Sequence, residues 1–110
     1  MDTRITSQSG VTIVEVQGKL DTTNAHTFQA QMLKAIDDGS AKVLIDCTNL
    51  GYVSSAGLRS ILAAGKKTKA LGGKVLLCNP NAMVREVLEI TGLAPMFPSF
   101  SSREEAIAAF

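Results

Sequence analysis

Two short apolar runs, Val43–Ile45 and Val75–Leu77, constrain this chain most strongly. Each run is continuous rather than alternating, which is typical of a central strand covered on both faces. Each is followed by a segment whose apolar residues recur at helical spacing. Strands that are joined through helices run parallel to their neighbours, with right-handed crossovers. The sequence therefore predicts an α/β protein with a mostly parallel sheet.

The other segments extend this pattern. Arg4–Gln8 and Val11–Gln17 are predicted as strands of an amino-terminal hairpin, since Ser9 and Gly10 between them form a turn signal. Pro95–Phe100 is predicted as a short edge strand because it contains two prolines. Four helices are expected, beginning near Asp21–Asn24, covering Leu58–Leu71, lying around Val84–Leu88, and following the capping-box signature Ser101–Glu105. The expected fold is a mixed, mostly parallel sheet of four to five strands with about four helices.

Length and composition limit the classes of function. A chain of 110 residues predicts one domain over 1–110, and a net charge of +1 gives no strong field for direct nucleic-acid binding. No apolar run is long enough to span a membrane, and residues 1–4 lack a signal-peptide profile, so we expect a cytoplasmic protein, by default a monomer. Cys47, Cys78 and His26 have no metal-site spacing, so buried free thiols and no cofactor are expected.

The segment Leu50–Leu58 joins the predicted central strand to the second helix and contains the adjacent Ser54 and Ser55. Serine at a helix start can accept a hydrogen bond from a free backbone N–H, and the same N–H groups favour an anion there. In open α/β sheets, ligands and partners meet the loops at the carboxyl ends of the strands. Three such loops are predicted, comprising Leu20–Asn24, Cys47–Ser55 and Asn79–Asn81.

A catalytic role for this segment has little support in the sequence. Neither serine is framed by glycines as in a hydrolase nucleophile elbow, and the one histidine, His26, is expected to be exposed or half-packed. No glycine-rich nucleotide-binding motif follows a strand. Asp46 has no neighbouring acidic pair to hold the magnesium that a phosphorylated aspartate needs, so we expect it to cap backbone N–H groups of its own loop.

A serine that receives a phosphate from a partner is the remaining interpretation. The phosphate would add about −1.5 to −2 charges at a helix start. Arg59 lies one turn beyond Ser55 and could pair with it. The simpler reading, in which both serines only cap the helix, is the alternative.

Three segments together resemble the STAS domain of small bacterial anti-sigma factor antagonists. Gly18–Ala25 is similar to the family's G-x-L-D-x-x-x-A segment. Val43–Asp46 followed by Leu50–Val53 is similar to its central strand and loop, and Ser54–Leu58 is similar to its D-S-[ST]-G-L phosphorylation motif. The resemblance covers essentially the whole chain and implies a STAS-like fold.

The resemblance also implies a function and a partner. Such proteins bind an anti-sigma factor that is also a serine/threonine kinase, which frees a sigma factor; phosphorylation reverses this and a PP2C-type phosphatase restores the active form. Ser55 matches the phosphorylated serine. Ser54 replaces the usual aspartate and is the alternative acceptor, whereas Ala56 replaces a second hydroxyl residue. The partner-binding residues expected from the resemblance are Leu20, Asp21, Thr22, Thr23, Asn24, Tyr52, Val53, Ser54, Ser55, Ala56, Gly57, Leu58 and Arg59.

Two rival functions follow from the same residues. The first is a STAS interaction module in another assembly, such as a lipid-transport complex or a stressosome-like scaffold, without a phosphorylation switch. The second is a small serine hydrolase that uses Ser54 or Ser55. The main expectation is a regulatory protein that is not an enzyme.

Overall fold

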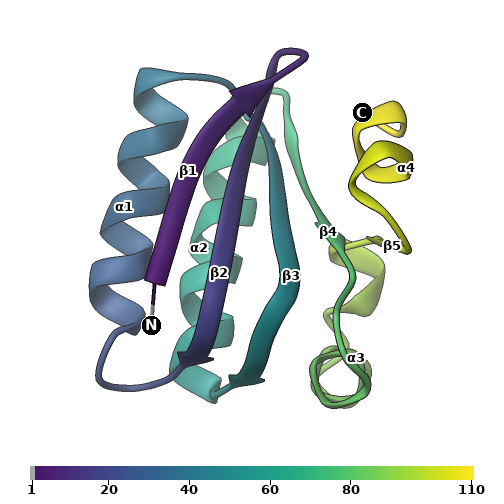
Figure 1. Ribbon diagram of the computed structural model, residues 1–110. Coiled ribbons are helices and arrows are strands. Elements are labelled where there is room, and N and C mark those ends of the chain that lie inside the picture. The colour runs from purple at the N-terminus through teal and green to yellow at the C-terminus, as the bar shows by residue number, and fades with distance from the viewer. Residues whose placement is uncertain (1) are drawn as a thin grey trace.

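The computed structural model describes residues 2–110, in which strands and helices alternate in the predicted order (Figure 1). The strands are β1 (Asp2–Gln8), β2 (Val11–Leu20), β3 (Lys42–Val53), β4 (Lys74–Cys78) and β5 (Ser99–Phe100). The α-helices are α1 (Ala25–Asp38), α2 (Ser55–Ala70), α3 (Ala82–Ile90) and α4 (Arg103–Ala108), with a 3₁₀ helix η1 at Ala94–Met96.

One five-stranded sheet has the order β1-β2-β3-β4-β5. β1 is antiparallel to β2, and every other neighbouring pair is parallel. The turn between β1 and β2 has positive φ at both central residues, 54° at Ser9 and 78° at Gly10, as a tight hairpin turn requires. The predicted hairpin and the predicted mixed, mostly parallel sheet are confirmed.

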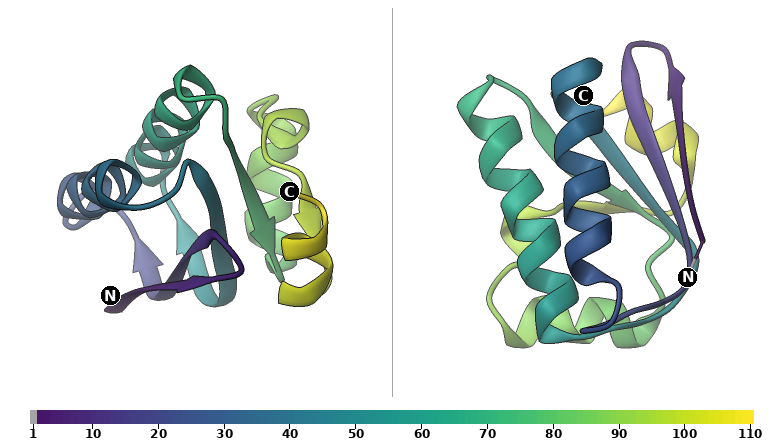
Figure 2. Two further views of the ribbon diagram at one scale, coloured as in Figure 1. Left: turned by 90° about the horizontal axis from the view of Figure 1, so that it is seen from above. Right: turned by 90° about the vertical axis from the view of Figure 1, so that its left-hand side faces the viewer.

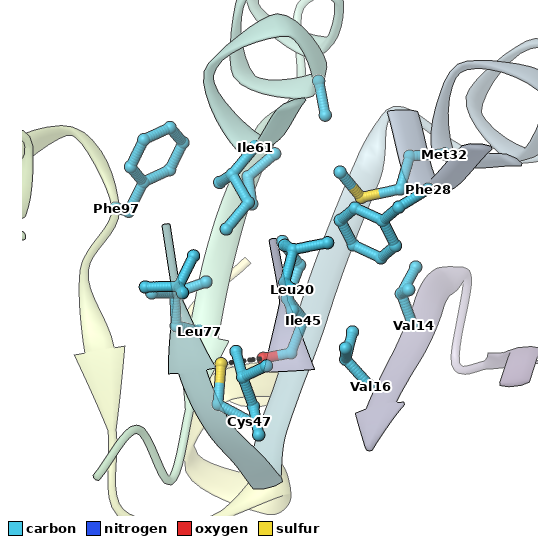
Figure 3. Packing of buried hydrophobic residues seen from close by; sticks show 14 of the residues in the cluster. Val14, Val16, Leu20, Phe28, Met32, Ile45, Cys47, Ile61, Leu77 and Phe97 are labelled. Atoms are coloured by element: carbon cyan, nitrogen blue, oxygen red, sulfur yellow. Dashed lines mark hydrogen bonds between the residues drawn. The ribbon is translucent and has the colours of Figure 1, made fainter. Parts of the chain in front are cut away.

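Helices cover the two faces of the sheet unequally (Figures 1 and 2). α1 and α2 lie side by side along one face, where Phe28, Met32 and Ile61 meet residues of β2, β3 and β4 in the larger core (Figure 3). On the opposite face α4 covers a smaller core that includes Leu44, Leu76 and Ala106. The continuous apolar runs of β3 and β4 therefore supply buried side chains to both faces, as predicted.

The last strand is shorter than predicted and lies later in the chain. β5 contains only Ser99 and Phe100 and lies at the edge of the sheet, as expected, but Met96 lies in η1 instead of a strand. Phe97 is buried against α2, where a Cβ atom on Gly65 would lie 2.8 Å from the Phe97 ring. Packing of this ring on the helix, together with the fixed φ of the prolines, replaces the strand pairing that the sequence pattern suggested.

The second half of β3 is the main departure from the predicted fold. Residues 47–53 were expected to be a loop, but they pair with β2 as far as Leu20 and Val53. Two register shifts interrupt this ladder, and beyond Asp46 the buried residues recur every third position, at Cys47, Leu50 and Val53. β-bulges explain the pattern because each inserts an extra residue into one strand. The expected alternation of a strand is thereby hidden in the sequence.

Candidate functional site

The carboxyl ends of β2 and β3 and the starts of α2 and α3 gather at one end of the molecule, the lower end in Figure 1. Leu20 is the register partner of Val53, and the Ser54 N–H donates to the Leu20 carbonyl at 2.9 Å. The structure therefore brings the Leu20 segment and the serine segment together.

Gly57 allows the first turn of α2 to approach these strand ends closely. A Cβ atom at Gly57 would lie 2.8 Å from the Leu20 carbonyl oxygen and 2.9 Å from a methyl carbon of Val53. Both distances are shorter than side chains tolerate, so only glycine fits here without movement of the backbone. The glycine of the serine motif therefore fixes where the helix start lies.

Asp21–Asn24 forms a compact turn next to the serine segment. The Asp21 carboxylate accepts from the Thr23 N–H at 2.9 Å and from the Thr23 hydroxyl at 2.5 Å. The hydrogen bond from the Thr23 hydroxyl is the main reason that the pKa of Asp21 is lowered. Asn24 occupies the cap position of α1, but its side chain turns back to the Asp21 N–H and the Lys19 carbonyl instead of capping the helix. These hydrogen bonds connect the residues of the turn to one another and to the end of β2.

Ser54 and Ser55 have different surroundings. The Ser54 hydroxyl is half-buried and accepts a hydrogen bond from the Gly57 N–H at 3.2 Å, so Ser54 is the N-cap of α2. Ser55 is the first residue of α2 and is exposed, and its hydroxyl makes no hydrogen bond within residues 2–110. The structure thus gives the capping role to one serine and leaves the other accessible.

A shallow hollow of about 180 Å³ lies beside Ser55. Leu58, Leu62 and Leu93 make its lining mainly apolar, and Ser55, Arg59 and Thr91 complete it. Thr91, the C-cap of α3, and Leu93, two residues further on, are not among the predicted site residues. The sequence marks this position only as a helix end, and nothing in it shows that the end packs beside α2.

The predicted partner-binding residues divide into two groups in the structure. Leu20, Val53, Gly57 and Leu58 are buried, so they support the surface from below. The residues that are exposed or half-buried are Asp21, Thr22, Thr23, Asn24, Tyr52, Ser54, Ser55, Ala56 and Arg59. Tyr52 is a large side chain with 43 % of its surface exposed.

Asp46 caps its own segment, as predicted. Its carboxylate accepts from the Thr48 N–H at 3.0 Å and from the Thr48 hydroxyl at 2.6 Å. Its other oxygen accepts from Arg103 at 2.8 Å, and the same guanidinium nitrogen donates to Glu15. Burial opposes ionisation of Asp46, but the bonds from Thr48 and Arg103 outweigh it and lower the pKa of this carboxyl. Arg103 lies 57 residues away from Asp46 along the chain, so no local sequence pattern points to this contact.

Other candidate groups contribute less to this site. His26 is exposed on α1, as expected. Cys47 and Cys78 are free and buried, and burial is the main cause that raises the pKa of Cys78 to about 12. Among the described residues no cluster of histidine, cysteine and carboxylate side chains is suited to bind a metal ion. No helix within 2–110 combines the length and apolar character that crossing a membrane requires.

Comparison with known proteins places the chain in a family. The family model of the STAS domain matches residues 2–106. BtrV of Bordetella bronchiseptica, described as a candidate anti-sigma factor antagonist, is 40% identical over 101 residues, which cover 92% of this chain and 87% of the relative. The anti-sigma F factor antagonist of Paenibacillus polymyxa is 29% identical over 99 residues, 89% of this chain and 85% of that protein.

Solved structures share the fold. The unphosphorylated form of the anti-sigma factor antagonist SpoIIAA superposes with a TM-score of 0.85 at 24% identity, covering 98% of this chain and 95% of that one. The phosphorylated form of the Bacillus protein SpoIIAA gives a TM-score of 0.78 at 22% identity, with 98% of each chain covered. The match of the family model over residues 2–106 shows that the chain belongs to the STAS domain family. Its similarity to these relatives supports a function as an anti-sigma factor antagonist.

Proposed function

We propose that this protein is an anti-sigma factor antagonist controlled by phosphorylation of Ser55. Unmodified, it binds an anti-sigma factor that is also a serine/threonine kinase, and the sigma factor held by that partner is released. The kinase then transfers the γ-phosphoryl group of ATP to the Ser55 oxygen, which ends binding, and a PP2C-type phosphatase removes it by hydrolysis. We place this exchange in the cytoplasm. The observation that carries the proposal is that Ser55 is exposed, whereas the neighbouring Ser54 hydroxyl is engaged as the N-cap of α2.

The two serines differ as phosphate acceptors because only one has a structural role. Phosphorylation of Ser54 would break or distort the hydrogen bond that its side-chain oxygen accepts from the Gly57 N–H. An N-cap of this kind contributes about 1 kcal/mol to the stability of the fold. A phosphate on Ser55 breaks no hydrogen bond within the described residues. This difference favours Ser55 over the alternative Ser54.

The surface around Ser55 suits a protein partner in its unmodified state. The hollow lined by Leu58, Leu62 and Leu93 can take an apolar side chain, and desolvated apolar pockets commonly anchor protein interfaces. The exposed turn of Asp21–Asn24 and the exposed Tyr52 lie on the neighbouring strand ends. Tyrosine is among the residue types that contribute most to binding energy.

A phosphate on Ser55 affects the domain and the interface differently. At the first residue of α2 the helix dipole stabilises negative charge, and Arg59 lies one turn away as a possible partner. The domain therefore keeps its fold. A partner that covered the same hollow would have to desolvate a dianion, at a cost of several kcal/mol. Binding is lost without refolding.

The proposal is tested by exposing the purified protein to the anti-sigma factors encoded in its own genome. We expect one of them to be retained in a pull-down and, with ATP, to phosphorylate the peptide containing Ser55, as measured by mass spectrometry. Ser55→Ala should abolish the modification, whereas the matched control Ser54→Ala should keep it. Phosphate confined to Ser54, or absent from residues 50–60, would contradict the proposal.

The same experiments distinguish the rival functions. Retention of a transporter ATPase or a scaffold protein, without phosphorylation, would favour a STAS module in another assembly. Covalent labelling of Ser54 or Ser55 by a fluorophosphonate would instead favour a serine hydrolase.

A further inference from the structure

Among residues 2–110, β3 has a strand neighbour on one side only beyond Asp46. β4 follows β3 from Lys42 to Asp46 and then ends at Cys78, whereas β2 accompanies β3 as far as Val53. Residues 47–53 are the segment that carries the chain to Ser54 and Ser55. Backbone groups without a strand neighbour still need hydrogen-bond partners, and side chains commonly supply them.

Two asparagines after β4 take the place of the missing strand. The Asn79 amide donates to the Thr48 hydroxyl at 3.0 Å. The Asn81 amide donates to two consecutive carbonyls, to Leu50 at 3.3 Å and to Gly51 at 3.4 Å. The Asn81 NH2 group has two N–H donors, so it can donate to both carbonyls, and the long distances make each of the two hydrogen bonds weak.

The carbonyls that Asn81 contacts belong to the second bulge of β3. Gly18 pairs with Leu50 and Lys19 pairs with Tyr52, so Gly51 is the extra residue. Carbonyls of a regular strand alternate between its two edges, and a bulge breaks this alternation. A single amide group can therefore reach two successive carbonyls at this position.

Asn81 also holds the start of α3. Its side-chain oxygen accepts from the Val84 N–H at 2.8 Å, which makes Asn81 the N-cap of that helix. One side chain thus connects the first turn of α3 to the bulge at Gly51. These two roles use different atoms, the oxygen for the helix and the nitrogen for the strand, so a substitution can separate them.

We propose that Asn81 is a positioning residue for the phosphate acceptor Ser55, an inference that rests on the proposed function of this serine. By holding the bulge at Gly51, Asn81 sets the side-chain register of the residues that follow. Val53 is then buried, with 2 % of its surface exposed, and the Ser54 N–H reaches the Leu20 carbonyl. Loss of the bulge would shift the register by one residue and direct Val53 to the opposite face.

The proposal is tested with Asn81→Ser in the full chain. The serine hydroxyl keeps an acceptor for the α3 cap but does not reach the two carbonyls. We expect amide hydrogen exchange at Ser54, followed by NMR, to accelerate about fivefold, as loss of one modest hydrogen bond would produce. Exchange at Val84 and at the core residue Ile45 should stay unchanged. An unchanged rate at Ser54 would overturn the proposal.

Two further variants separate the roles of the side chain. Asn81→Asp keeps the acceptor for Val84 and places an oxygen against the carbonyls, so it should also accelerate exchange at Ser54. If both variants lose protection at Val84 and Ser54 together, Asn81 acts only through the helix cap, and the proposal fails. Asn79→Gly is the control, because glycine adopts the φ of 55° found at Asn79. If Asn79→Gly accelerates amide exchange at Ser54 as much as Asn81→Ser does, then any change after β4 destabilises this strand end. That result would also overturn the positioning role of Asn81.

The effect on modification is measured with the kinase identified by the pull-down. We expect kcat/KM for phosphorylation of Asn81→Ser to fall about fivefold, as loss of about 1 kcal/mol of transition-state positioning would produce, with the KM for ATP unchanged. If Ser55 of the unaltered protein takes no phosphate, the proposed function fails, whereas the exchange rates at Ser54 and Val84 still decide whether Asn81 holds the bulge. Unchanged kcat/KM beside accelerated exchange would overturn the positioning role.

Discussion

Two neighbouring serines show how a single position decides the role of a hydroxyl group. Ser54 has an extended backbone and accepts from the first turn of α2, so its oxygen is part of the fold. Ser55 is one residue further on, within the helix, and its side chain is exposed. A motif of two serines therefore contains one structural group and one group that is accessible for chemistry.

This division predicts unequal effects on stability. Ser54→Ala should lower the free energy of unfolding by about 1 kcal/mol, because the Gly57 N–H loses its partner. Ser55→Ala, the matched control, should change it by less than about 0.5 kcal/mol. Urea denaturation of the two variants measures both values. Equal losses would mean that Ser55 shares the capping role.

The sequence identified the serine motif but not the separate roles of its members. Spacing alone placed both hydroxyls at a helix start, because a cap and a first helical residue are both typical positions for serine. The distinction depends on backbone angles, with φ −90° and ψ 175° at Ser54, that only the folded chain defines.

At the scale of elements, an arginine at the start of α4 adds ion pairs to the apolar packing of this helix on the sheet. Arg103 begins α4 and its guanidinium donates to Glu15 of β2 and to Asp46 of β3, both at 2.8 Å. The Asp46 side chain is 12% exposed, so this pair is better shielded than the surface pair of Lys34 and Asp38. We infer that the charge of Asp46 stabilises the docking of α4.

The pKa of Asp46 gives this contact a pH dependence. Since the folded-state pKa lies below the ordinary value of 3.8, the stabilisation is present above that value and is lost as the pH falls through the lowered pKa. Asp46→Asn should therefore destabilise the protein by about 1–2 kcal/mol near neutral pH, and the difference from the unaltered protein should shrink towards about pH 3.

Urea denaturation across this pH range measures the effect, with Asp38→Asn as a control. The Asp38 side chain is 63% exposed, so its removal should change stability by less than about 0.5 kcal/mol near neutral pH. A deficit of Asp46→Asn that stays constant down to about pH 3 would assign the effect to packing instead of charge.

β3 also shows why the elements were only partly predictable. Val43–Ile45 has the continuous apolar pattern of a buried strand and was predicted correctly. Residues 47–53 carry a three-residue spacing of buried side chains that a regular strand does not show, so the sequence pattern does not indicate a strand there. Local patterns do not show bulges that are held by distant groups such as Asn81.

At the scale of the whole molecule, the sheet brings segments that are distant in sequence to one end. Three segments lie together there, namely the Asp21–Asn24 turn, the serine segment and the end of α3. The two faces of the sheet, in contrast, are each covered by helices and carry a buried core. The order of strands and helices was sufficient to predict that strand ends would meet. It did not predict the hollow beside Ser55, because that depends on where the chain at the end of α3 lies relative to α2.

A phosphate on this end of the molecule is expected to change binding without changing the fold. The structure has no buried side-chain nitrogen or oxygen without a partner among residues 2–110, and Ser55 contributes to neither core. The phosphorylated protein should therefore show amide NMR shifts that differ from those of the unmodified protein only near the start of α2 and the hollow. Shift changes throughout the sheet would indicate refolding.

We expect a phosphate on Ser55 to abolish binding to the anti-sigma factor kinase. Isothermal titration calorimetry of that partner with the unmodified and the Ser55-phosphorylated protein tests it most directly. A desolvation cost of several kcal/mol predicts a Kd at least about 100-fold higher for the phosphorylated form, with the original affinity restored after treatment with a PP2C-type phosphatase. Equal Kd values for the two forms would show that phosphorylation of Ser55 does not control binding.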